Sequence, residues 1–467
     1  MRLLLVSANR ERSPYPVFPL GLAYLCDPLR SAGHELFVLD LCFEEDPVAA
    51  AAARVAEIGP DAVLISIRNM DNVTWPGSRF YLDGVREVVS AVKGAAPVIV
   101  GGSGFSLMPL QALEYLGADY GVVGEGEEVL PRLLERIARG QASEDLPGVL
   151  RAGASVFLPP LPVERIGTPD RSLFQVERYH REGGMANVLT KRGCPFSCIY
   201  CIYPLLEGCR MRLRPVPEII DEIRRLVEDH GINYLYFVDD IFNYPPEEAE
   251  RLCRAMAAEG LPVKWSAFVN PGFFSRRLLD AMLAAGCDGI EFGTDSGSPE
   301  MLRSLGKSFA VEDIREASAI CRETGVDFAH YLLFGGPGET EETIRESFAL
   351  MDEVAPTAVI GMTGIRVFPG TELHQVSVGE GGPSSPEEML RPVFYLASGI
   401  EKNLCDIVTG LAMERKNWVV PGLDINMSDR MLEAIRHMPV QGPLWKLMKH
   451  LNRTRIRPHM QQAGKQS

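Results

Sequence analysis

The sequence predicts an α/β protein with two sheet-containing domains and a mostly helical C-terminal segment. Two observations support this prediction. Short, continuously apolar runs alternate with helical stretches along residues 1–140 and again along about 185–375, which is typical of parallel strands covered on both faces. The chain also has 467 residues, enough for about three domains of ordinary size.

Residues 1–140 are expected to form a doubly wound parallel sheet. Five apolar runs, each followed by a turn signal, are the expected strands: 3–6, 36–39, 62–67, 98–102 and 120–124. Helices are expected near residues 20–32, 47–58, 78–93, 107–117 and 126–139. Such sheets bind ligands beyond the carboxyl ends of their strands. There the sequence places Ser66 and two glycine-rich loops, 101–104 and 124–127.

Residues 141–180 are expected to be a linker, because Pro147-Gly148 and Pro159-Pro160 interrupt regular structure. Residues 181–375 are expected to form a partial (β/α)6 barrel, whose active site would lie at the carboxyl ends of its strands. The barrel strands are expected near residues 186–191, 232–240, 263–269, 289–294, 327–335 and 358–367. Residues 376–467 are expected to form the helical C-terminal segment.

The composition excludes several classes of protein. A formal net charge of −15 argues against a nucleic-acid partner, which requires a basic face. No apolar run approaches the ~18–20 residues that span a bilayer, and the apolar start is too short for a signal peptide. A cytoplasmic location is therefore expected. The segment from Gln441 has six Lys or Arg and no Asp or Glu, which leaves open weak contact with a membrane surface or a solvated tail.

Three of the ten cysteines lie close together in one loop. These are Cys194, Cys198 and Cys201. They follow the expected strand at 186–191, with the spacing C-x3-C-x2-C. Three thiolates in so short a loop can surround one compact cluster, and a [4Fe–4S] cluster, which normally takes four thiolates, would keep one iron open. Structural zinc is the alternative, but it needs a fourth ligand nearby, for which only Cys209 is available.

This loop, with the aromatic Tyr200 before its last cysteine, resembles the signature of the radical S-adenosylmethionine (SAM) superfamily. The resemblance extends along residues 185–375 through motifs at 237–242, 291–298 and 333–340. It implies that the three cysteines hold a [4Fe–4S] cluster and that SAM contacts Tyr200, Asp239, Asp240, Glu291, Asp295, Ser296, Gly335 and Gly336. Taken alone, the Asp239-Asp240 pair would more often end a strand or cap a helix, and the glycines would form an ordinary turn.

The first domain resembles the flavodoxin-like cobalamin-binding domain that precedes many radical SAM enzymes. The matching segments are 19–25, 31–35, 60–66, 100–104 and 124–127. The resemblance implies cobalamin contacts at Ser66, Gly101, Gly102, Ser103, Gly124, Glu125 and Gly126. The Asp-x-His-x-x-Gly motif of the mutase type is absent, so no histidine from it would ligate cobalt. A nicotinamide-binding domain is the competing interpretation, but no glycine follows the first strand before Gly21.

Together, the two resemblances imply a cobalamin-dependent radical SAM enzyme. The expected activity is C-methylation of an unactivated carbon in a lipid or small metabolite, with an electron donor such as flavodoxin or ferredoxin. One alternative is a cobalamin-binding radical enzyme that cyclises, rearranges or oxidises its substrate, and a non-catalytic cobalamin or SAM sensor is another. A methylthiotransferase is disfavoured, because the first domain has only Cys26 and Cys42 where a second three-cysteine cluster would be expected.

Overall fold

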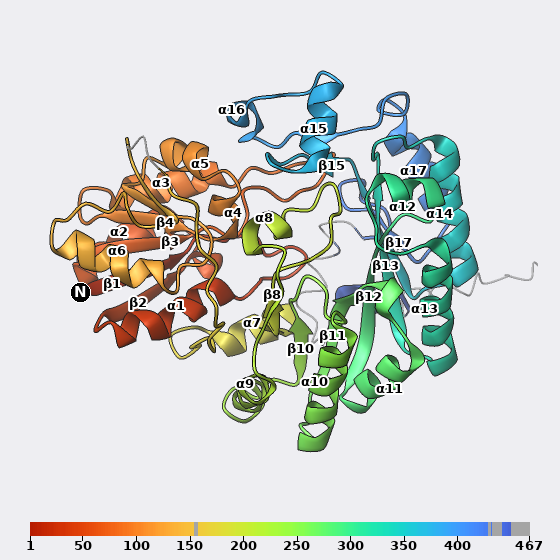
Figure 1. The fold of residues 1–467 in the computed structure, drawn as a ribbon, viewed down its shortest axis with the longest axis horizontal. Coiled ribbons are helices and arrows are strands. Elements are labelled where there is room, and N and C mark those ends of the chain that lie inside the picture. The colour runs from red at the N-terminus through yellow and green to blue at the C-terminus, as the bar shows by residue number, and fades with distance from the viewer. Residues whose placement is uncertain (154–156, 428–430, 432–440, 450–467) are drawn as a thin grey trace, which may run out of the picture.

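The chain folds as two α/β units, each built on a sheet of largely parallel strands (Figure 1). The computed structural model describes residues 1–153, 157–427, 431 and 441–449. Buried apolar side chains form two large clusters, and each cluster contains residues from both units. The two units therefore share their packing, which fixes the first sheet against the second.

The first sheet has the strand order β2-β1-β3-β4-β5-β6, and its first five strands confirm the predicted doubly wound fold of the flavodoxin-like type. Its strands are β1 Arg2–Ser7, β2 Glu35–Asp40, β3 Ala62–Ser66, β4 Val98–Gly101, β5 Tyr120–Val122 and β6 Val149–Arg151. Its helices are α1 Leu20–Ser31, α2 Pro47–Ile58, α3 Leu82–Val92, α4 Ser103–Ser106, α5 Pro109–Leu116 and α6 Val129–Ala138. Asp46 caps α2 by accepting from the backbone of Val48 and Ala49.

The segment expected to be a linker contains regular structure. Strand β6 pairs antiparallel with β5, and α7 begins at Val176 and ends at Gly183. Val149 and Leu150 are buried, so a short apolar pair completes the edge of the first sheet. A run of three residues between turns is too short to be predicted from periodicity.

The second sheet is fully parallel and forms an open barrel with the order β17-β14-β13-β12-β11-β10-β7. The six predicted strands are β7 Ala186–Val188, β10 Tyr234–Phe237, β11 Lys264–Val269, β12 Cys287–Asp295, β13 Asp327–Phe334 and β14 Ala358–Thr363. The principal covering helices are α9 Val216–Glu228, α10 Pro246–Glu259, α11 Arg276–Ala284, α13 Val311–Thr324 and α14 Glu341–Val354. Shorter helices are α12 Pro299–Ser304 and α15 Glu372–Gly379. The partial barrel predicted from the sequence is confirmed.

The C-terminal segment is less helical than expected in its described part. Beside α16 Pro386–Met389 and α17 Leu404–Ala412, it supplies strand β16 Phe394–Tyr395 and strand β17 Trp418–Val419, which extends the barrel sheet next to β14. A short 3-10 helix, η3 Leu444–Leu447, follows. Among the described residues, no helix is both long and apolar enough to cross a membrane.

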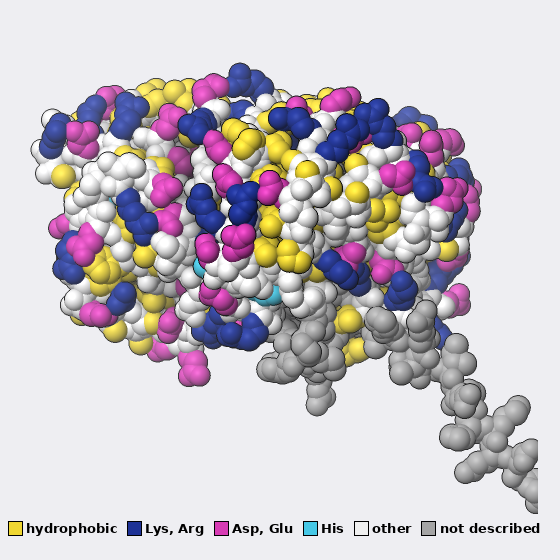
Figure 2. Space-filling view, turned by 90° about the horizontal axis from the view of Figure 1, so that it is seen from below, with side chains coloured by type: hydrophobic (Ala, Val, Ile, Leu, Met, Phe, Trp, Pro, Cys, Tyr) yellow, Lys and Arg dark blue, Asp and Glu magenta, His cyan; other side chains and the backbone are white. Residues whose placement is uncertain are grey.

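The basic tail is only partly described. Lys446 pairs with Asp288 at 2.8 Å and Lys449 with Asp327 at 2.8 Å, so these two lysines bind the barrel rather than standing free. The other basic positions of the tail, in 450–467, lie outside the described residues. On the face shown in Figure 2, basic and acidic side chains are interspersed.

Candidate functional site

The cysteine loop connects strand β8 (Lys191–Arg192) to helix α8 (Tyr203–Glu207). Gly193 opens the loop with a φ of +93°, and a Cβ there would lie 2.4 Å from the carbonyl oxygen of Arg210, so only glycine fits. Its N–H donates to Oε2 of Glu207 at 2.8 Å. Within the loop, the N–H of Cys201 donates to the carbonyl of Cys198 at 3.0 Å. These backbone contacts hold the cysteine loop in one conformation.

The three cysteine thiols lie near one another in a largely buried site. Burial raises the pKa of Cys194 to about 11 and that of Cys201 to about 12, and the other two thiols add to the shift at Cys201. In the part of the chain that the structure describes, no three Cys, His, Asp or Glu side chains are placed as ligands of a single ion. The donor set nevertheless fits an iron–sulfur cluster, because it offers three thiols from one loop and iron binding favours loss of their protons.

Asp295 braces the cysteine loop from the end of β12. Its carboxylate accepts a hydrogen bond from the hydroxyl of Tyr200 and pairs with Nζ of Lys307 at 2.7 Å. Neighbouring Ser296 faces helix α14 instead, with its Oγ 3.0 Å from Oγ of Ser347. These three predicted SAM contacts thus already have protein partners, and contact of SAM with Tyr200, Asp295 and Ser296 stays a prediction.

Asp239 and Asp240, at the end of β10, differ in their surroundings. Oδ1 of Asp239 accepts from the N–H of Thr190 at 2.6 Å and from that of Lys191 at 3.3 Å. Oδ2 of Asp240 is buried without a hydrogen-bond partner among the described residues. Burial, with the nearby carboxylates of Glu207 and Asp239, raises the pKa of Asp240 to about 8. Of the two carboxylates, Asp240 is thus the one with an unpartnered oxygen in the described part of the chain, and contact of SAM with Asp239 and Asp240 stays a prediction.

The glycine turn after β13 is organised by Glu339. Gly335 and Gly336 donate their N–H groups to Oε2 of Glu339, and Gly335 has a φ of +100°. Burial raises the pKa of Glu339 to about 7, although the two backbone donors oppose the shift. This carboxylate therefore holds the backbone of the turn in place beside the predicted SAM site.

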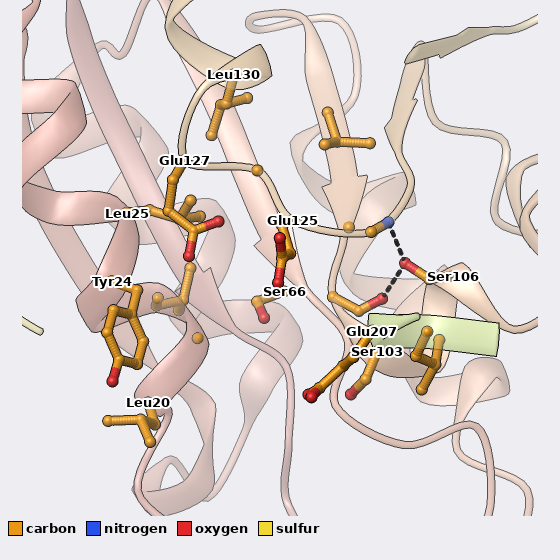
Figure 3. A pocket seen from close by; sticks show the side chains of 18 of the residues that line it. Leu20, Tyr24, Leu25, Ser66, Ser103, Ser106, Glu125, Glu127, Leu130 and Glu207 are labelled. Atoms are coloured by element: carbon orange, nitrogen blue, oxygen red, sulfur yellow. Dashed lines mark hydrogen bonds between the residues drawn. The ribbon is translucent and has the colours of Figure 1, made fainter. Parts of the chain in front are cut away.

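A cavity of about 320 Å³ lies at the carboxyl ends of β3, β4 and β5 (Figure 3). It brings together every residue that the resemblance implied for cobalamin: Ser66, Gly101, Gly102, Ser103, Gly124, Glu125 and Gly126. Its opposite wall comes from the barrel unit, through Leu189, Arg192, Tyr203, Leu206, Glu207 and Val238. The sequence did not predict that these residues line the cavity, because their place there depends on how the two units pack.

A cluster of buried charges ties this cavity to the cysteine loop. Arg212, on strand β9 (Arg212–Leu213), pairs with Glu125 at 2.6 Å, and Arg192 pairs with Glu127 at 2.7 Å and with Glu125 at 3.1 Å. Since Arg192 stands two residues before Cys194, the rim of the cavity and the start of the loop are held by the same side chain.

The arginines that follow the loop are engaged in salt bridges. Arg210 pairs with Glu164 at 2.5 Å, and Arg214 pairs with Glu222 at 2.7 Å. These arginines therefore pair with neighbouring acids.

Comparison with known families agrees with this geometry. Residues 188–351 match the model of the Radical SAM superfamily, and residues 6–134 match that of the B12 binding domain. The chain is a radical SAM protein with a B12-binding domain. The family predicted from the cysteine loop is thereby confirmed, and the first domain is of the B12-binding rather than the nicotinamide-binding type.

Relatives of this radical SAM protein include methyltransferases. It is 28% identical to the tryptophan 2-C-methyltransferase of Streptomyces laurentii, over 76% of this chain and 71% of the relative. It is 27% identical to an uncharacterised methyltransferase of Pyrococcus horikoshii, over 81% of this chain and 83% of that one.

Solved structures resemble the chain over nearly its whole length. The radical SAM methyltransferase TsrM from Kitasatospora setae, with cobalamin and a [4Fe–4S] cluster bound, superposes with a TM-score of 0.85 at 25% identity, covering 97% of this chain and 98% of that one. A second structure of TsrM, with tryptophan substrate and a SAM analogue bound, gives a TM-score of 0.86.

Glu291 of this radical SAM protein is hydrogen-bonded to two aromatic side chains, and its contact with SAM stays a prediction. Its carboxylate points into the barrel, where it accepts from Nε1 of Trp445 at 3.0 Å and from the hydroxyl of Tyr236 at 3.2 Å. Neither partner was predicted from the sequence. Alternation along β10 could have placed Tyr236 on the inner face, but nothing in the sequence relates Trp445, 154 residues away, to this strand.

Proposed function

We propose that the chain is a cobalamin-dependent radical SAM C-methyltransferase that acts on a small molecule. The observation that carries the proposal is the joining of two sites by one hairpin. Arg192 reaches Glu127 on the rim of the 320 Å³ cavity, and the chain turns at Gly193 directly into the cysteine loop. A cofactor in the cavity and a cluster at the loop would therefore face one reaction space. The methyltransferase relatives support this assignment.

The chain offers a holder for each group that this reaction needs. Cys194, Cys198 and Cys201 would hold a [4Fe–4S] cluster, Asp240 would bind the amino group of SAM, and the cavity would take cobalamin. Bound there, these groups would supply an electron for SAM and a transferable methyl group. The protein's own part is positioning, because a reactive centre must meet its substrate in one orientation and away from water.

Individual side chains perform that positioning. The carboxylate of Asp295 holds the hydroxyl of Tyr200, which fixes the cysteine loop against β12. Glu207 accepts from the N–H of Gly193 at the start of the loop and also lines the cavity. Glu339 orients the glycine turn. These contacts hold the cysteine loop and the cavity wall in a fixed relation.

The proposal includes two partners. One is a small-molecule substrate, and the other is an electron donor such as flavodoxin or ferredoxin, because the family chemistry starts by reducing the cluster. Contact with a membrane surface through the basic tail, and a cytoplasmic location, stay predictions from the sequence.

The test uses protein purified without oxygen and loaded with iron, sulfide and hydroxocobalamin. We expect about four irons and one cobalt per chain, and S-adenosylhomocysteine after SAM and a strong reductant are added with a small-molecule extract. Cys198→Ala should lose the iron but retain cobalt. Deoxyadenosine without S-adenosylhomocysteine would favour a cyclising, rearranging or oxidising enzyme, and folded protein that neither binds iron nor consumes SAM would overturn the proposal.

A further inference from the structure

The concave face of the barrel sheet carries an aromatic hollow over its central strands, defined by Tyr236, Phe268, Gly293 and Tyr331. The ring centroids of Phe268 and Tyr331 are 4.7 Å apart, and those of Tyr236 and Phe268 are 6.5 Å apart. All four residues are partly exposed, although their strands lie in the middle of the sheet. A Cβ at Gly293 would meet no atom within 4 Å, so open space lies above this position.

The floor of the hollow contains the carboxylate of Glu291, which is 1% exposed. Among the described residues, the groups that stabilise its charge are the hydroxyls of Tyr236 and Tyr331 and the indole of Trp445, with no Lys, Arg or His. Burial exceeds their effect and raises the pKa of Glu291. The carboxylate therefore lacks a positive partner.

Two other buried carboxylates, Asp71 and Glu222, have such a partner. Asp71 pairs with Arg366 at 3.0 Å, and Glu222 pairs with Arg171 at 2.6 Å. A buried charge is expensive unless it is paired. The contrast indicates that a cation brought by a ligand would fit over Glu291.

The hydroxyl groups of Tyr236 and Tyr331 connect the carboxylate of Glu291 to the hollow. Because the O–H of Tyr236 donates to Glu291, its oxygen keeps lone pairs that can accept a hydrogen bond from a ligand. The aromatic rings around it also favour a cation or a stacked ring. Burial raises the pKa of Tyr15, from the B12-binding unit, and the nearby carboxylate of Glu291 adds to that rise, so the hollow adjoins the unit that contains the cavity.

We propose that the aromatic hollow is the substrate site and selects a ring-bearing amine in its protonated form. Glu291 is the positioning residue: it orients the hydroxyls of Tyr236 and Tyr331 and supplies the negative charge that compensates the ammonium. The inference rests on the proposed function, since it names the substrate class of the same enzyme.

The test measures binding of three ring-matched probes to the reconstituted protein by calorimetry: tryptamine, 3-indolepropionic acid and 3-methylindole. We expect tryptamine to bind at least about tenfold tighter than indolepropionic acid, because a negative charge in a poorly solvated site discriminates strongly between the two. Glu291→Gln should reduce that ratio to below about threefold and leave 3-methylindole unchanged. Equal binding of the two charged probes, or a ratio that survives Glu291→Gln, would overturn the inference.

Two further variants keep the test decisive. Tyr236→Phe retains the carboxylate but removes one acceptor oxygen, and should lower the ratio even if Glu291→Gln fails to fold. Asp288→Asn is the matched control, because Asp288 lies on the same strand and accepts from Tyr234 but pairs with Lys446. Its ratio should equal that of the wild type.

Failure of this inference can be told apart from failure of the proposed function. The same preparation is assayed for S-adenosylhomocysteine in parallel with binding. Product formation without amine preference would overturn only the substrate class. Amine preference without any consumption of SAM would support the hollow as a binding site and contradict the proposed function.

Discussion

The carboxylate of Asp239 accepts hydrogen bonds from both the backbone N–H and the hydroxyl of Thr190. This contact joins the end of β10 to the chain just after β7, immediately before the cysteine loop. The adjacent Asp240 leaves Oδ2 without a partner among the described residues. The two neighbouring carboxylates therefore differ: Asp239 holds the backbone at Thr190, whereas Asp240 has an oxygen unpartnered within the described ranges, to which we assign the amino group of SAM.

Asn substitution should separate these two roles. Asp240→Asn should weaken SAM binding by about 10- to 100-fold, because a charged hydrogen bond to the ammonium is lost, with little effect on stability. Asp239→Asn should lower the free energy of unfolding by about 2–4 kcal/mol. Equilibrium dialysis with labelled SAM and denaturant unfolding measure the two effects. Unchanged SAM affinity in Asp240→Asn would contradict the assignment.

Lys307 is predicted to be required for a stable cysteine loop. Lys307→Met leaves the buried carboxylate of Asp295 without its cation, which should cost about 3 kcal/mol of unfolding free energy and reduce iron content after reconstitution. The double variant Asp295→Asn with Lys307→Met should recover much of the stability, since no unpaired charge is then buried. If the single variant keeps full stability and full iron content, the ion pair does not support the loop.

Glu339 should make stability depend on pH. Its pKa is raised from 4.5 to about 7 in the folded protein, so the folded state binds the proton more tightly than the unfolded state. Stability from this group is therefore greatest below about pH 4.5 and falls by at most about 3 kcal/mol as the pH rises through 7. Glu339→Gln should remove that component. If the wild type and Glu339→Gln give parallel curves of unfolding free energy against pH, Glu339 does not cause this pH dependence.

Arg192 should control retention of cobalamin. Arg192→Met removes the cation shared by Glu125 and Glu127, so we expect a loss of about 2–4 kcal/mol in stability and less cobalt per chain after gel filtration. Arg210→Met is the matched control, because the side chains of Arg210 and Glu164 are 70% and 78% exposed and such pairs contribute little. Equal cobalt retention in both variants would contradict a role for Arg192.

The sequence predicted five strands of the first sheet, β1 to β5, and six of the second, because apolar runs and turn signals are local. The run at 263–269, for example, corresponds to Lys264–Val269. Strand β17 was missed because Trp418–Val419 has only two residues and pairs with β14, which is remote in the chain. The strands that were missed depend on tertiary contacts rather than on their own sequence.

The candidate site was predicted less completely than the fold. The motif at 291–298 marks the correct strand, but the register shifts between Gly293 and Asp295. After that shift, Asp295 faces the cysteine loop and Ser296 faces α14, whereas Glu291, before the shift, lies within the barrel. Such a reorientation cannot be read from motif spacing. The contribution of Trp445 likewise depends on a C-terminal segment that returns to the barrel.

The most direct test of the account is the fate of the SAM methyl group. Protein loaded with iron, sulfide and hydroxocobalamin is incubated with trideuteromethyl-SAM and reductant, and the cobalamin and nucleoside products are analysed by mass spectrometry. If the cysteine loop and the cavity serve one reaction space, the labelled methyl group will be found on cobalamin, together with S-adenosylhomocysteine. Fully loaded protein that forms only deoxyadenosine and labelled methionine, with no label on cobalamin, would contradict the account.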